Sequence, residues 1–335
     1  MTSIKEHWNY FSGTGIDRSS DKRLNKEYLK EALCKQDTQF VVFQNCTPLV
    51  EEEEGDEKCL VKFFHAEVEK YFDLKLSGND AKWPPYLLYM GRFDVDYFAL
   101  NKLDKDWKVL EGLLTEKRSF AKGFVLATQI CDKDSGLVSQ AQSMFQWHDR
   151  YRFCPTCGSK MFIEEAGYKK TCLVETCRSN KGVHNTCYPR TDPTVIMIVI
   201  SQNGRKCLLG RKRGWPKRMF SCLAGFMEPG ESVEDAVKRE TLEESGVTVS
   251  NVCYHSSQPW PFPGSLMIGC QATAQTEDIV VNEEEMDDVR WFDHVTVTRA
   301  LKGMSEELIL GPKQTIAHQL IKHWVENSTA KSSSL

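Results

Sequence analysis

The sequence predicts an α/β protein that is built from more than one compact unit. Short apolar runs such as Val195–Ile200 are typical of buried strands, because they are β-branched and too short for a helix. Residues 233–245 instead place Val233, Ala236 and Val237 on one face at helical spacing, which predicts an amphipathic helix. The 335 residues give room for about two or three units.

Composition narrows the class of protein. Hydrophobic residues make up 41% and charged residues 27%, as in ordinary globular proteins, and the net charge of -4 gives no overall attraction to nucleic acid or to an anionic membrane. No apolar run approaches the roughly 20 residues that span a bilayer, and the N-terminus has no apolar signal core. We therefore expect an intracellular chain whose 13 cysteines are mostly reduced thiols or metal ligands.

The first part of the chain predicts a mixed α/β domain over residues 1–125. Phe40–Phe43 and Tyr86–Tyr89 are expected to be strands, whereas Glu51–Glu54 and Ser77–Asp80 are expected to be connections. A helical connector is expected over 126–150, with its helix near Gln140–Trp147.

A second, larger α/β domain is expected over residues 191–327. Asp192–Pro193 is expected to form an opening turn, followed by strands at Val195–Ile200, at Lys206–Leu209 and around Val252–Tyr254. Ile316, Leu320 and Trp324 share one face and predict a last helix that packs on the sheet. A disordered tail is expected over 328–335.

Four cysteines with short spacings predict a zinc site in the segment 151–190. Cys154 and Cys157 form one pair and Cys172 and Cys177 the other, which is the pattern of a Cys₄ zinc ribbon. Four thiolates close a tetrahedral shell, so one structural zinc is expected. The alternative is a redox CxxC, which needs a strand before it and a helix after it. His184 and Cys187 are further candidates to replace one ligand.

The predicted helix at 233–245 carries carboxylates where its apolar face ends. Ser232 can cap its start and Gly246 can end it. Glu240, Glu243 and Glu244 continue the apolar face, and a bare buried carboxylate is unfavourable by several kcal/mol. Divalent cations such as Mg²⁺ or Mn²⁺ resolve this conflict, because carboxylate oxygens suit them. Arg239 lies one turn before Glu243 and can orient it. The alternative is a solvated acidic helix.

A rigid segment follows that could hold a planar base. Prolines at three alternate positions exclude a helix. The aromatic rings of Trp260 and Phe262 lie between these prolines, and Gln258 and Ser265 at the two ends can form hydrogen bonds. The alternative is a packed loop. The candidate substrate-binding residues of this segment are Gln258, Pro259, Trp260, Pro261, Phe262, Pro263, Gly264 and Ser265.

Taken together, these motifs resemble the NADH pyrophosphatase branch of the Nudix hydrolases. Residues 225–247 match the Nudix box G-x5-E-x7-R-E-U-x-E-E-x-G-U, where U is aliphatic, except that Thr241 stands at an aliphatic position. The segment S-Q-P-W-P-F-P-x-S and a zinc ribbon before the box are this branch's other hallmarks. The resemblance extends from about Ala141 to the end. It is closest to animal members that act on NAD(H) and NAD-capped RNA, but ankyrin repeats are absent and Asn185–Cys187 resembles an insertion.

The resemblance implies a fold, a reaction and an assembly. The fold is a Nudix α/β/α sandwich that is preceded by a zinc ribbon and a mixed N-terminal domain. The reaction is metal-dependent hydrolysis of the diphosphate of NADH or NAD⁺, including removal of the NAD cap from RNA, and the assembly is a homodimer. The open alternatives are another diphosphate substrate such as ADP-ribose or a dinucleoside polyphosphate, a non-catalytic NAD(H)-binding protein, and a ribbon protein that binds nucleic acid or protein.

The resemblance also assigns roles to residues. Glu240 and Glu244 are expected to bind about two or three Mg²⁺ or Mn²⁺ ions together with Glu285 and the carbonyl of Ala224, and Glu284 is the rival of Glu285. Glu243 is expected to assist as a base, and Arg239 belongs to the catalytic set. Further pocket residues complete the expected site: Tyr188 and Phe226 around the nicotinamide, and Ala317 from the last helix.

Two further expectations concern a basic surface region and the cellular compartment of the protein. Seven basic residues between Arg205 and Arg218 are either a solvated surface or a positive rim that guides the substrate, and no general DNA- or RNA-binding module is recognised. The cytoplasm is the expected compartment. The terminal Ser-Ser-Leu resembles the peroxisomal signal Ser-Lys-Leu and makes peroxisomal import the alternative.

Overall fold

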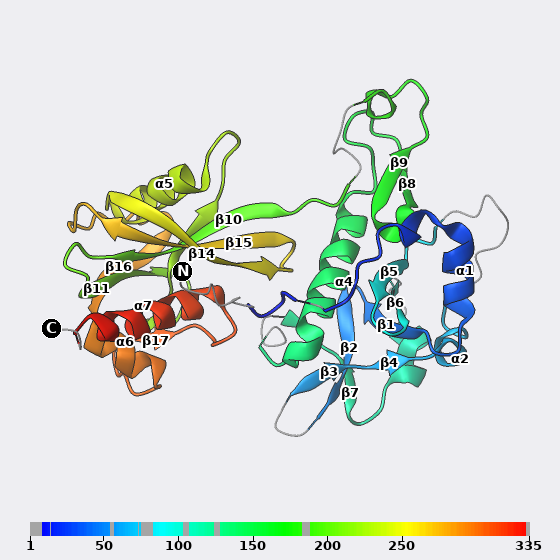
Figure 1. The fold of residues 1–335 in the computed structure, drawn as a ribbon, viewed down its shortest axis with the longest axis horizontal. Helices are drawn as coiled ribbons and strands as arrows, with labels where there is room; N and C mark the ends of the chain where they lie inside the picture. Colours follow the sequence, from blue (N-terminus) through cyan, green and yellow to red (C-terminus); the bar gives the residue numbers. More distant parts are fainter. Residues whose placement is uncertain are drawn as a thin grey trace. The chain divides into compact units, whose positions relative to one another are not determined.

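The computed structural model describes residues 9–13, 15–53, 57–72, 74, 83–102, 107–123, 128–182 and 188–332. Their backbone forms two compact units. The N-terminal unit comprises residues 11–191 and 261–264, and the C-terminal unit comprises residues 9–10, 192–260 and 265–332. Both units combine helices with sheets (Figure 1), so the α/β class is confirmed.

The N-terminal unit is built on a mixed sheet with the strand order β3-β2-β1-β6-β5, in which β4 pairs with β1 and β7 pairs with β2. β1 and β6 are parallel, and the other pairs are antiparallel. Its strands are β1 Gln39–Gln44, β2 Thr47–Glu52, β3 Lys58–Leu60, β4 Lys62–Phe63, β5 Leu87–Arg92, β6 Asp96–Lys102 and β7 Arg118–Phe120.

Helices cover both faces of this sheet. Leu29 and Leu33 of α1 (Lys26–Cys34) share an apolar cluster with Phe40, and Asn25 caps this helix by accepting from the Tyr28 amide. On the other face Phe145 of α4 (Asp132–Arg150) lies 5.5 Å from the ring of Phe43. The shorter helical segments are α2 His65–Val68, η1 Lys22–Leu24, η3 Trp107–Leu113, η4 Glu165–Gly167 and η5 Arg178–Asn180.

The expected strands at 40–43 and 86–89 and the expected helix near 140–147 are confirmed as β1, β5 and α4. The connection expected at Glu51–Glu54 is wrong for its first half, because Glu51 and Glu52 lie in β2. Glu51 forms an ion pair with Arg118 of the neighbouring β7 at 3.2 Å, which keeps the acidic strand end in the sheet. Ser77–Asp80 lies outside the described residues.

The end of α4 joins a small hairpin of β8 (Met161–Glu164) and β9 (Lys169–Cys172). His148 is buried at this junction, and its ring lies 2.7 Å from the Gly167 carbonyl, to which Nε2–H donates. Burial lowers the pKa of His148 to about 4. The neutral imidazole is therefore part of what fixes α4 to this hairpin.

The C-terminal unit has a second mixed sheet with the order β14-β15-β10-β11-β16, in which β13 pairs with β10 and β12 pairs with β17 separately. β10 is parallel to β15 and antiparallel to β11 and β13. Its strands are β10 Asp192–Ile200, β11 Lys206–Lys212, β12 Met219–Phe220, β13 Leu223–Phe226, β14 Val249–Trp260, β15 Ser265–Ala274, β16 Met286–Asp293 and β17 Ile309–Leu310.

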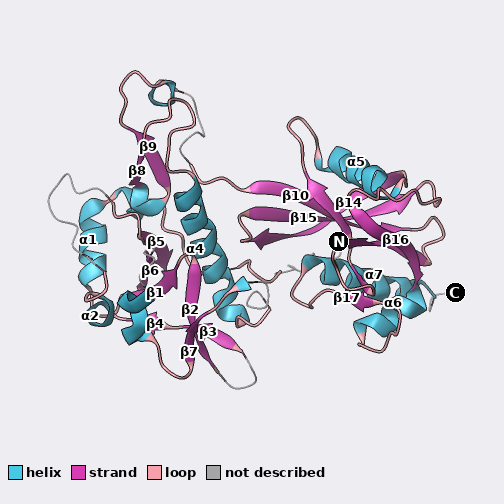
Figure 2. Cartoon of the chain, turned by 180° about the vertical axis from the view of Figure 1, so that it is seen from behind, coloured by secondary structure: helices cyan, strands magenta, loops and turns pink. Residues whose placement is uncertain are grey.

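Alternate residues of β10 point into two separate cores. Ile196 and Ile198 belong to the cluster that includes α7 (Ile316–Ser332), and α6 (His294–Leu301) adds Val297 to it. Val195 and Met197 belong to the cluster with α5 (Val233–Ser245). The helices thus lie on opposite faces of the sheet (Figure 2), and the predicted α/β/α sandwich is confirmed.

Two boundaries in this unit differ from expectation. Asp192 and Pro193 are strand residues of β10 rather than a turn, and a proline at a strand's start costs no ladder bond. The backbone of α7 continues to Ser332, into the segment that was expected to be a tail, and residues 333–335 lie outside the described part. The finer division into domains at 125, 150 and 190 stays a prediction.

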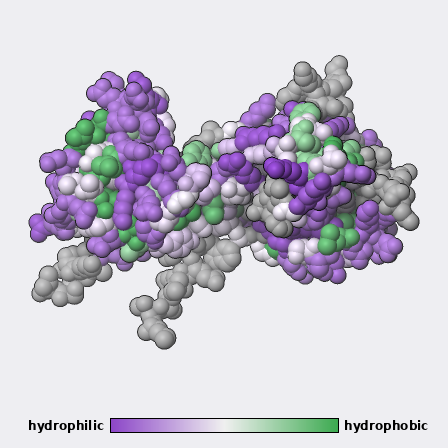
Figure 3. All heavy atoms as spheres, turned by 90° about the horizontal axis from the view of Figure 1, so that it is seen from above, coloured by the Kyte–Doolittle hydropathy of each residue, from purple (hydrophilic) through white to green (hydrophobic). Residues whose placement is uncertain are grey.

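In the described part of the chain, no helix is long and apolar enough to cross a membrane. The face drawn in Figure 3 is mainly hydrophilic, and its apolar side chains lie in small groups.

Candidate active site

The central element of the site is α5, and its ends are set by local hydrogen bonds. The Ser232 hydroxyl accepts from the Asp235 amide, and the Asp235 carboxylate accepts in return from the Ser232 amide. Gly246 ends the helix in the left-handed conformation, with φ of 73°. Both predicted caps are confirmed.

The helix presents two buried carboxylates beyond its apolar residues. Ala236 and Val237 are fully buried, and Glu240 and Glu244 follow on the same side with 8% and 1% exposure. Glu243, in contrast, is exposed. The predicted continuation of the apolar face by carboxylates is therefore confirmed, and two of the three carboxylates are buried.

Burial disfavours the ionised form of these carboxylates when no cation is close to them. Burial is the main cause that raises the pKa of Glu244 to about 7, and it also raises the pKa of Glu240. The carboxylates of Glu240 and Glu285 raise the pKa of Glu244 further, whereas Lys212 lowers it. The carboxylates of Glu240, Glu244 and Glu285 therefore favour the binding of a positively charged ion between them.

Glu285 comes from outside the helix, in the turn before β16. Its amide donates to the Asn282 carbonyl at 3.1 Å, and its side chain is exposed. Its charge raises the pKa of both Glu240 and Glu244. This coupling is consistent with the expected choice of Glu285 as the third carboxylate.

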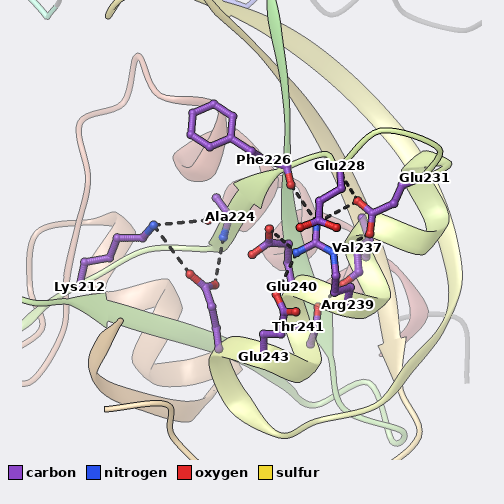
Figure 4. Close-up of polar contacts among 11 residues, drawn as sticks. Lys212, Ala224, Phe226, Glu228, Glu231, Val237, Arg239, Glu240, Thr241 and Glu243 are labelled. Carbon is purple, nitrogen blue, oxygen red and sulfur yellow. Dashed lines mark hydrogen bonds and ion pairs between the residues drawn. The ribbon is translucent and has the colours of Figure 1, made fainter. Parts of the chain in front are cut away.

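A backbone group and a lysine complete this side of the cluster. The amide of Ala224 on β13 donates to Glu244 at 3.2 Å. The Lys212 ammonium donates to the Ala224 carbonyl at 3.4 Å and lies 3.7 Å from the Glu244 carboxylate (Figure 4). In this structure the Lys212 ammonium is thus the positive charge nearest to Glu244 and the Ala224 carbonyl.

Arg239 connects the acidic residues to one another. Its guanidinium donates to the carboxylates of Glu240 at 2.8 Å and Glu243 at 2.9 Å. It also donates to Glu231 at two positions and to the Phe226 carbonyl at 2.8 Å (Figure 4). These hydrogen bonds lower the pKa of Glu231 to about 2. The predicted contact between Arg239 and Glu243 is confirmed, within a larger network.

The backbone of Gly225 lies directly against the Glu240 carboxylate. A Cβ at this position would overlap all three atoms of that carboxylate. Only glycine lets β13 approach the helix this closely. Thr241, the one departure from the box, is fully buried, and its hydroxyl donates to the Val237 carbonyl at 2.7 Å. The hydroxyl is therefore satisfied inside the helix.

The donor set suits a hard divalent cation. Glu240, Glu244, Glu285 and the Ala224 carbonyl offer only oxygen atoms, which Mg²⁺ and Mn²⁺ prefer. The ion pair between the Lys212 ammonium and the Glu244 carboxylate shows that a positive charge is stabilised at this position.

The four ribbon cysteines meet as predicted, with their Sγ atoms all within 4.8 Å of one another. The distances are 3.7 Å from Cys154 to Cys177 and 3.5 Å from Cys157 to Cys172, close to the roughly 3.8 Å edge of a zinc–thiolate tetrahedron. Burial raises the pKa of Cys154, but hydrogen bonds from the amides of Thr156 and Cys157 and from the side chains of Ser179 and Cys177 together lower that pKa to about 6. No helix follows Cys157, which disfavours the redox alternative. His184 and Cys187 lie outside the described residues.

The proline-rich segment is the end of a hairpin rather than a loop. Residues up to Trp260 belong to β14, Ser265 begins β15, and 261–264 form the turn. Gln258 is fully buried, and its amide donates to the Tyr10 and Gln314 carbonyls and accepts from the Ile316 amide. Its polar atoms thus hold the start of α7 and do not face an open pocket.

The remaining pocket candidates differ in exposure. The rings of Phe226 and Tyr188 are 61% and 45% exposed, in the C-terminal and N-terminal units respectively. Trp260 and Phe262 are partly exposed, and Phe262 lies edge-to-face with Phe11 at 6.0 Å. Ala317 is 6% exposed and packs in the α7 core.

Three functional candidates were given no role from the sequence. Gly225 and Glu231 were recognised as matched positions of the box, but the ion pair of Glu231 with Arg239 was not predicted. Lys212 stood among other basic residues, and no local pattern marks it. The need for glycine at 225 follows from a contact across elements, which a sequence does not display.

Comparison with known proteins is consistent with this geometry. Residues 190–308 match the NUDIX domain model, and residues 149–179 match the model of the NADH pyrophosphatase zinc ribbon domain. The chain is 42% identical to the human NAD-capped RNA hydrolase NUDT12, over 96% of this chain and 74% of that protein. It is 35% identical to the NAD-capped RNA hydrolase of Schizosaccharomyces pombe, over 93% and 92%. A solved NUDIX hydrolase from Nitrosomonas europaea is similar with a TM-score of 0.37 and 24% identity, over 52% and 91%.

Proposed function

The chain belongs to the Nudix hydrolases, in the branch that carries an NADH pyrophosphatase zinc ribbon, and we propose that it hydrolyses the central diphosphate of NADH, NAD⁺ and the NAD cap of RNA. One observation carries this proposal: Glu240 and Glu244 are buried on α5, and Glu244 accepts from the Ala224 amide, inside a Nudix box that departs from the pattern only at Thr241. The names of the relatives, which are NAD-capped RNA hydrolases, support the choice of substrate.

The reaction adds one water across the P–O–P anhydride. The water oxygen stays on one phosphorus, the bridging oxygen stays on the other, and both products leave as monophosphates. NADH gives reduced nicotinamide mononucleotide and AMP. An NAD cap gives nicotinamide mononucleotide and an RNA with a 5′-monophosphate.

We propose Glu240, Glu244, Glu285 and the Ala224 carbonyl as the groups that hold about two or three Mg²⁺ or Mn²⁺ ions. When bound, such ions would neutralise the diphosphate and lower the pKa of a bound water. Lys212 would then leave the Glu244 carboxylate, since its ammonium and a bound divalent ion would repel each other at this distance.

Arg239 positions the carboxylates rather than acting on the substrate. It fixes Glu240 through one guanidinium nitrogen and Glu231 through two. We assign Glu243 as the group that accepts part of the proton from the attacking water, because it is exposed and oriented by Arg239.

For the substrate, we propose Phe226 and Tyr188 as candidates to stack on the nicotinamide ring, because each side chain is exposed in its own unit. Residues 258–265 form the rim of the dinucleotide pocket through Trp260 and Phe262, with Gln258 as its buried support. Ala317 supports the pocket from the α7 core. The ribbon zinc is structural, because four thiolates leave no open position.

Assembly and compartment also stay proposals. We propose a homodimer, which light scattering on the purified protein tests, and a monomer there would refute it. We propose the cytoplasm, with peroxisomes as the alternative, and a fluorescent reporter that carries the last residues of the chain distinguishes the two.

The deciding experiment is mass-spectrometric product analysis after incubation of the purified protein with NADH and Mg²⁺, with a chelator control. We expect metal-dependent AMP and reduced nicotinamide mononucleotide. Intact NADH with cleavage of ADP-ribose or a dinucleoside polyphosphate would assign another substrate, and no cleavage at all would indicate a binding protein.

The matched variants are Glu244→Gln and Glu234→Gln. Both glutamates lie on α5, but Glu234 is exposed and outside the cluster. Glu244→Gln should lower turnover by at least about 100-fold with the fold intact, whereas Glu234→Gln should leave it unchanged. Near-normal activity of Glu244→Gln would reject the proposed metal site.

A further inference from the structure

A second cysteine-containing cluster is buried in the N-terminal unit, at the junction of β3 with the start of α4. Cys59 lies on β3, Cys131 is the N-cap residue of α4, and Asp134 lies in its first turn. Their exposures are 5%, 5% and 1%. The two sulfur atoms and a carboxylate oxygen all lie within 4.8 Å of one another.

Hydrogen bonds of the backbone amides bring these residues together. The Cys131 amide donates to the Lys58 carbonyl at 2.9 Å, and the Lys58 amide donates to the Gln129 carbonyl at 2.8 Å. The Leu60 amide donates to the Asp134 carboxylate at 2.9 Å. The donor atoms are therefore held in place before anything binds to them.

The spacing of the donors suits a tetrahedral metal ion. The distance from Cys131 Sγ to Asp134 Oδ2 is 3.4 Å, and a zinc ion with bonds of about 2.3 Å to sulfur and 2.0 Å to oxygen separates such atoms by roughly 3.5 Å. The Cys131 thiol donates to this carboxylate, and the Cys59 sulfur lies within 4.8 Å of both atoms.

Charge balance allows the ion to enter without a new buried charge. Asp134 is already paired with the Lys62 ammonium at 3.2 Å. When Zn²⁺ binds, the two S–H bonds break, two protons leave to water, and two thiolates form. The added charge of the ion equals the charge of the lost protons, so the net charge of the cluster stays the same.

We propose that Cys59, Cys131 and Asp134 form a second zinc site, with water at the fourth position, that fastens β3 to the start of α4. Mixed sulfur and oxygen donors favour zinc over Mg²⁺ or Ca²⁺, which take oxygen, and over Cu⁺, which takes sulfur. The site closes a long chain segment between Cys59 and Cys131 and so stabilises the N-terminal unit.

The zinc content of the purified full chain, measured by elemental mass spectrometry, tests this proposal. We expect two zinc ions per chain in the parent protein, and one in the variant Cys59→Ser/Cys131→Ser. The control is Cys270→Ser, a fully buried cysteine outside the metal clusters found among the described residues, and it should keep two. One zinc in the parent protein, or two in the double variant, would overturn the proposal.

A second measurement does not depend on how the double variant folds. The parent protein, with and without bound zinc, is treated with an alkylating reagent, and its peptides are analysed. Zinc should protect Cys59 and Cys131 from alkylation together. Equal labelling in both states, or a disulfide that links the two peptides, would overturn the proposal. Neither measurement uses catalytic activity, so their outcome is independent of the proposed function.

Discussion

Replacing Gly225 by alanine should lower catalytic turnover strongly and lower the stability of the fold only slightly. The new Cβ would overlap the Cδ and both carboxylate oxygens of Glu240, whereas ordinary contact begins at 3.4 Å. Glu240 is held from its other side by Arg239 at 2.8 Å, so the carboxylate must retreat by more than about 1 Å and lose this bond.

The size of the effect follows from that displacement. A shift of about 1 Å in a catalytic group costs on the order of 100-fold in rate, or about 3 kcal/mol of transition-state stabilisation. The free energy of unfolding should fall by only about 1–3 kcal/mol, which is typical of an overpacked contact. Turnover is measured with NADH and Mg²⁺, and stability by urea denaturation.

Gly311→Ala is the matched control, because its Cβ would meet only Thr315 Oγ1 at an ordinary 3.6 Å. We expect this variant to keep its activity and its stability. If Gly225→Ala turned over NADH at the normal rate, the close contact between β13 and Glu240 would have no catalytic importance, and the proposed ligand set would be refuted.

Further predictions follow from other parts of the structure. The folded pKa of His148 is about 4, below its ordinary 6.5, so its stabilisation is present above about pH 6.5 and is lost as the pH falls towards 4. The free energy of unfolding of the N-terminal unit should fall by about 3 kcal/mol. Urea denaturation between pH 7 and 4.5 measures this change. An equal pH dependence of stability in the parent protein and in His148→Gln would contradict the prediction. Gln258→Ala should lower the free energy of unfolding by about 3 kcal/mol, since the Ile316 amide loses its acceptor; a higher KM with unchanged stability would instead place Gln258 in the substrate pocket. Cys172→Ser should release the ribbon zinc and make residues 149–179 sensitive to protease, and undiminished zinc content would argue against the Cys₄ site.

The local features of the site were predictable from the sequence, because each depends on residues close in the chain. The caps of α5 at Ser232 and Gly246 and the spacing of its glutamates are of this kind, and so are the cysteine pairs of the ribbon. Helical periodicity fixes which side chains share a face, whatever the rest of the fold does.

What the sequence could not predict depends on contacts between distant segments. Gln258 was predicted to line the dinucleotide pocket, and its bond to the first amide of α7 was not predicted because it depends on strand register. Glu51 and Glu52 were expected in a loop because of their charge, but each forms an ion pair with a neighbouring strand, Glu51 with Arg118 and Glu52 with Lys58. Cys59 and Cys131 lie in no motif, and only the packing of β3 beside α4 brings them together.

The central position of β10 determines how the enzyme should lose activity on heating. Ala224 of β13 is paired with Ile196 in the middle of β10, which is itself hydrogen-bonded to β15 along its whole length. A local opening that moves the Ala224 carbonyl must therefore break the pairing of β13 with β10, the central strand of the sheet. Amides of β10 should be among the slowest to exchange with deuterium. Thermal inactivation should accordingly coincide with cooperative unfolding of this unit and should not precede it.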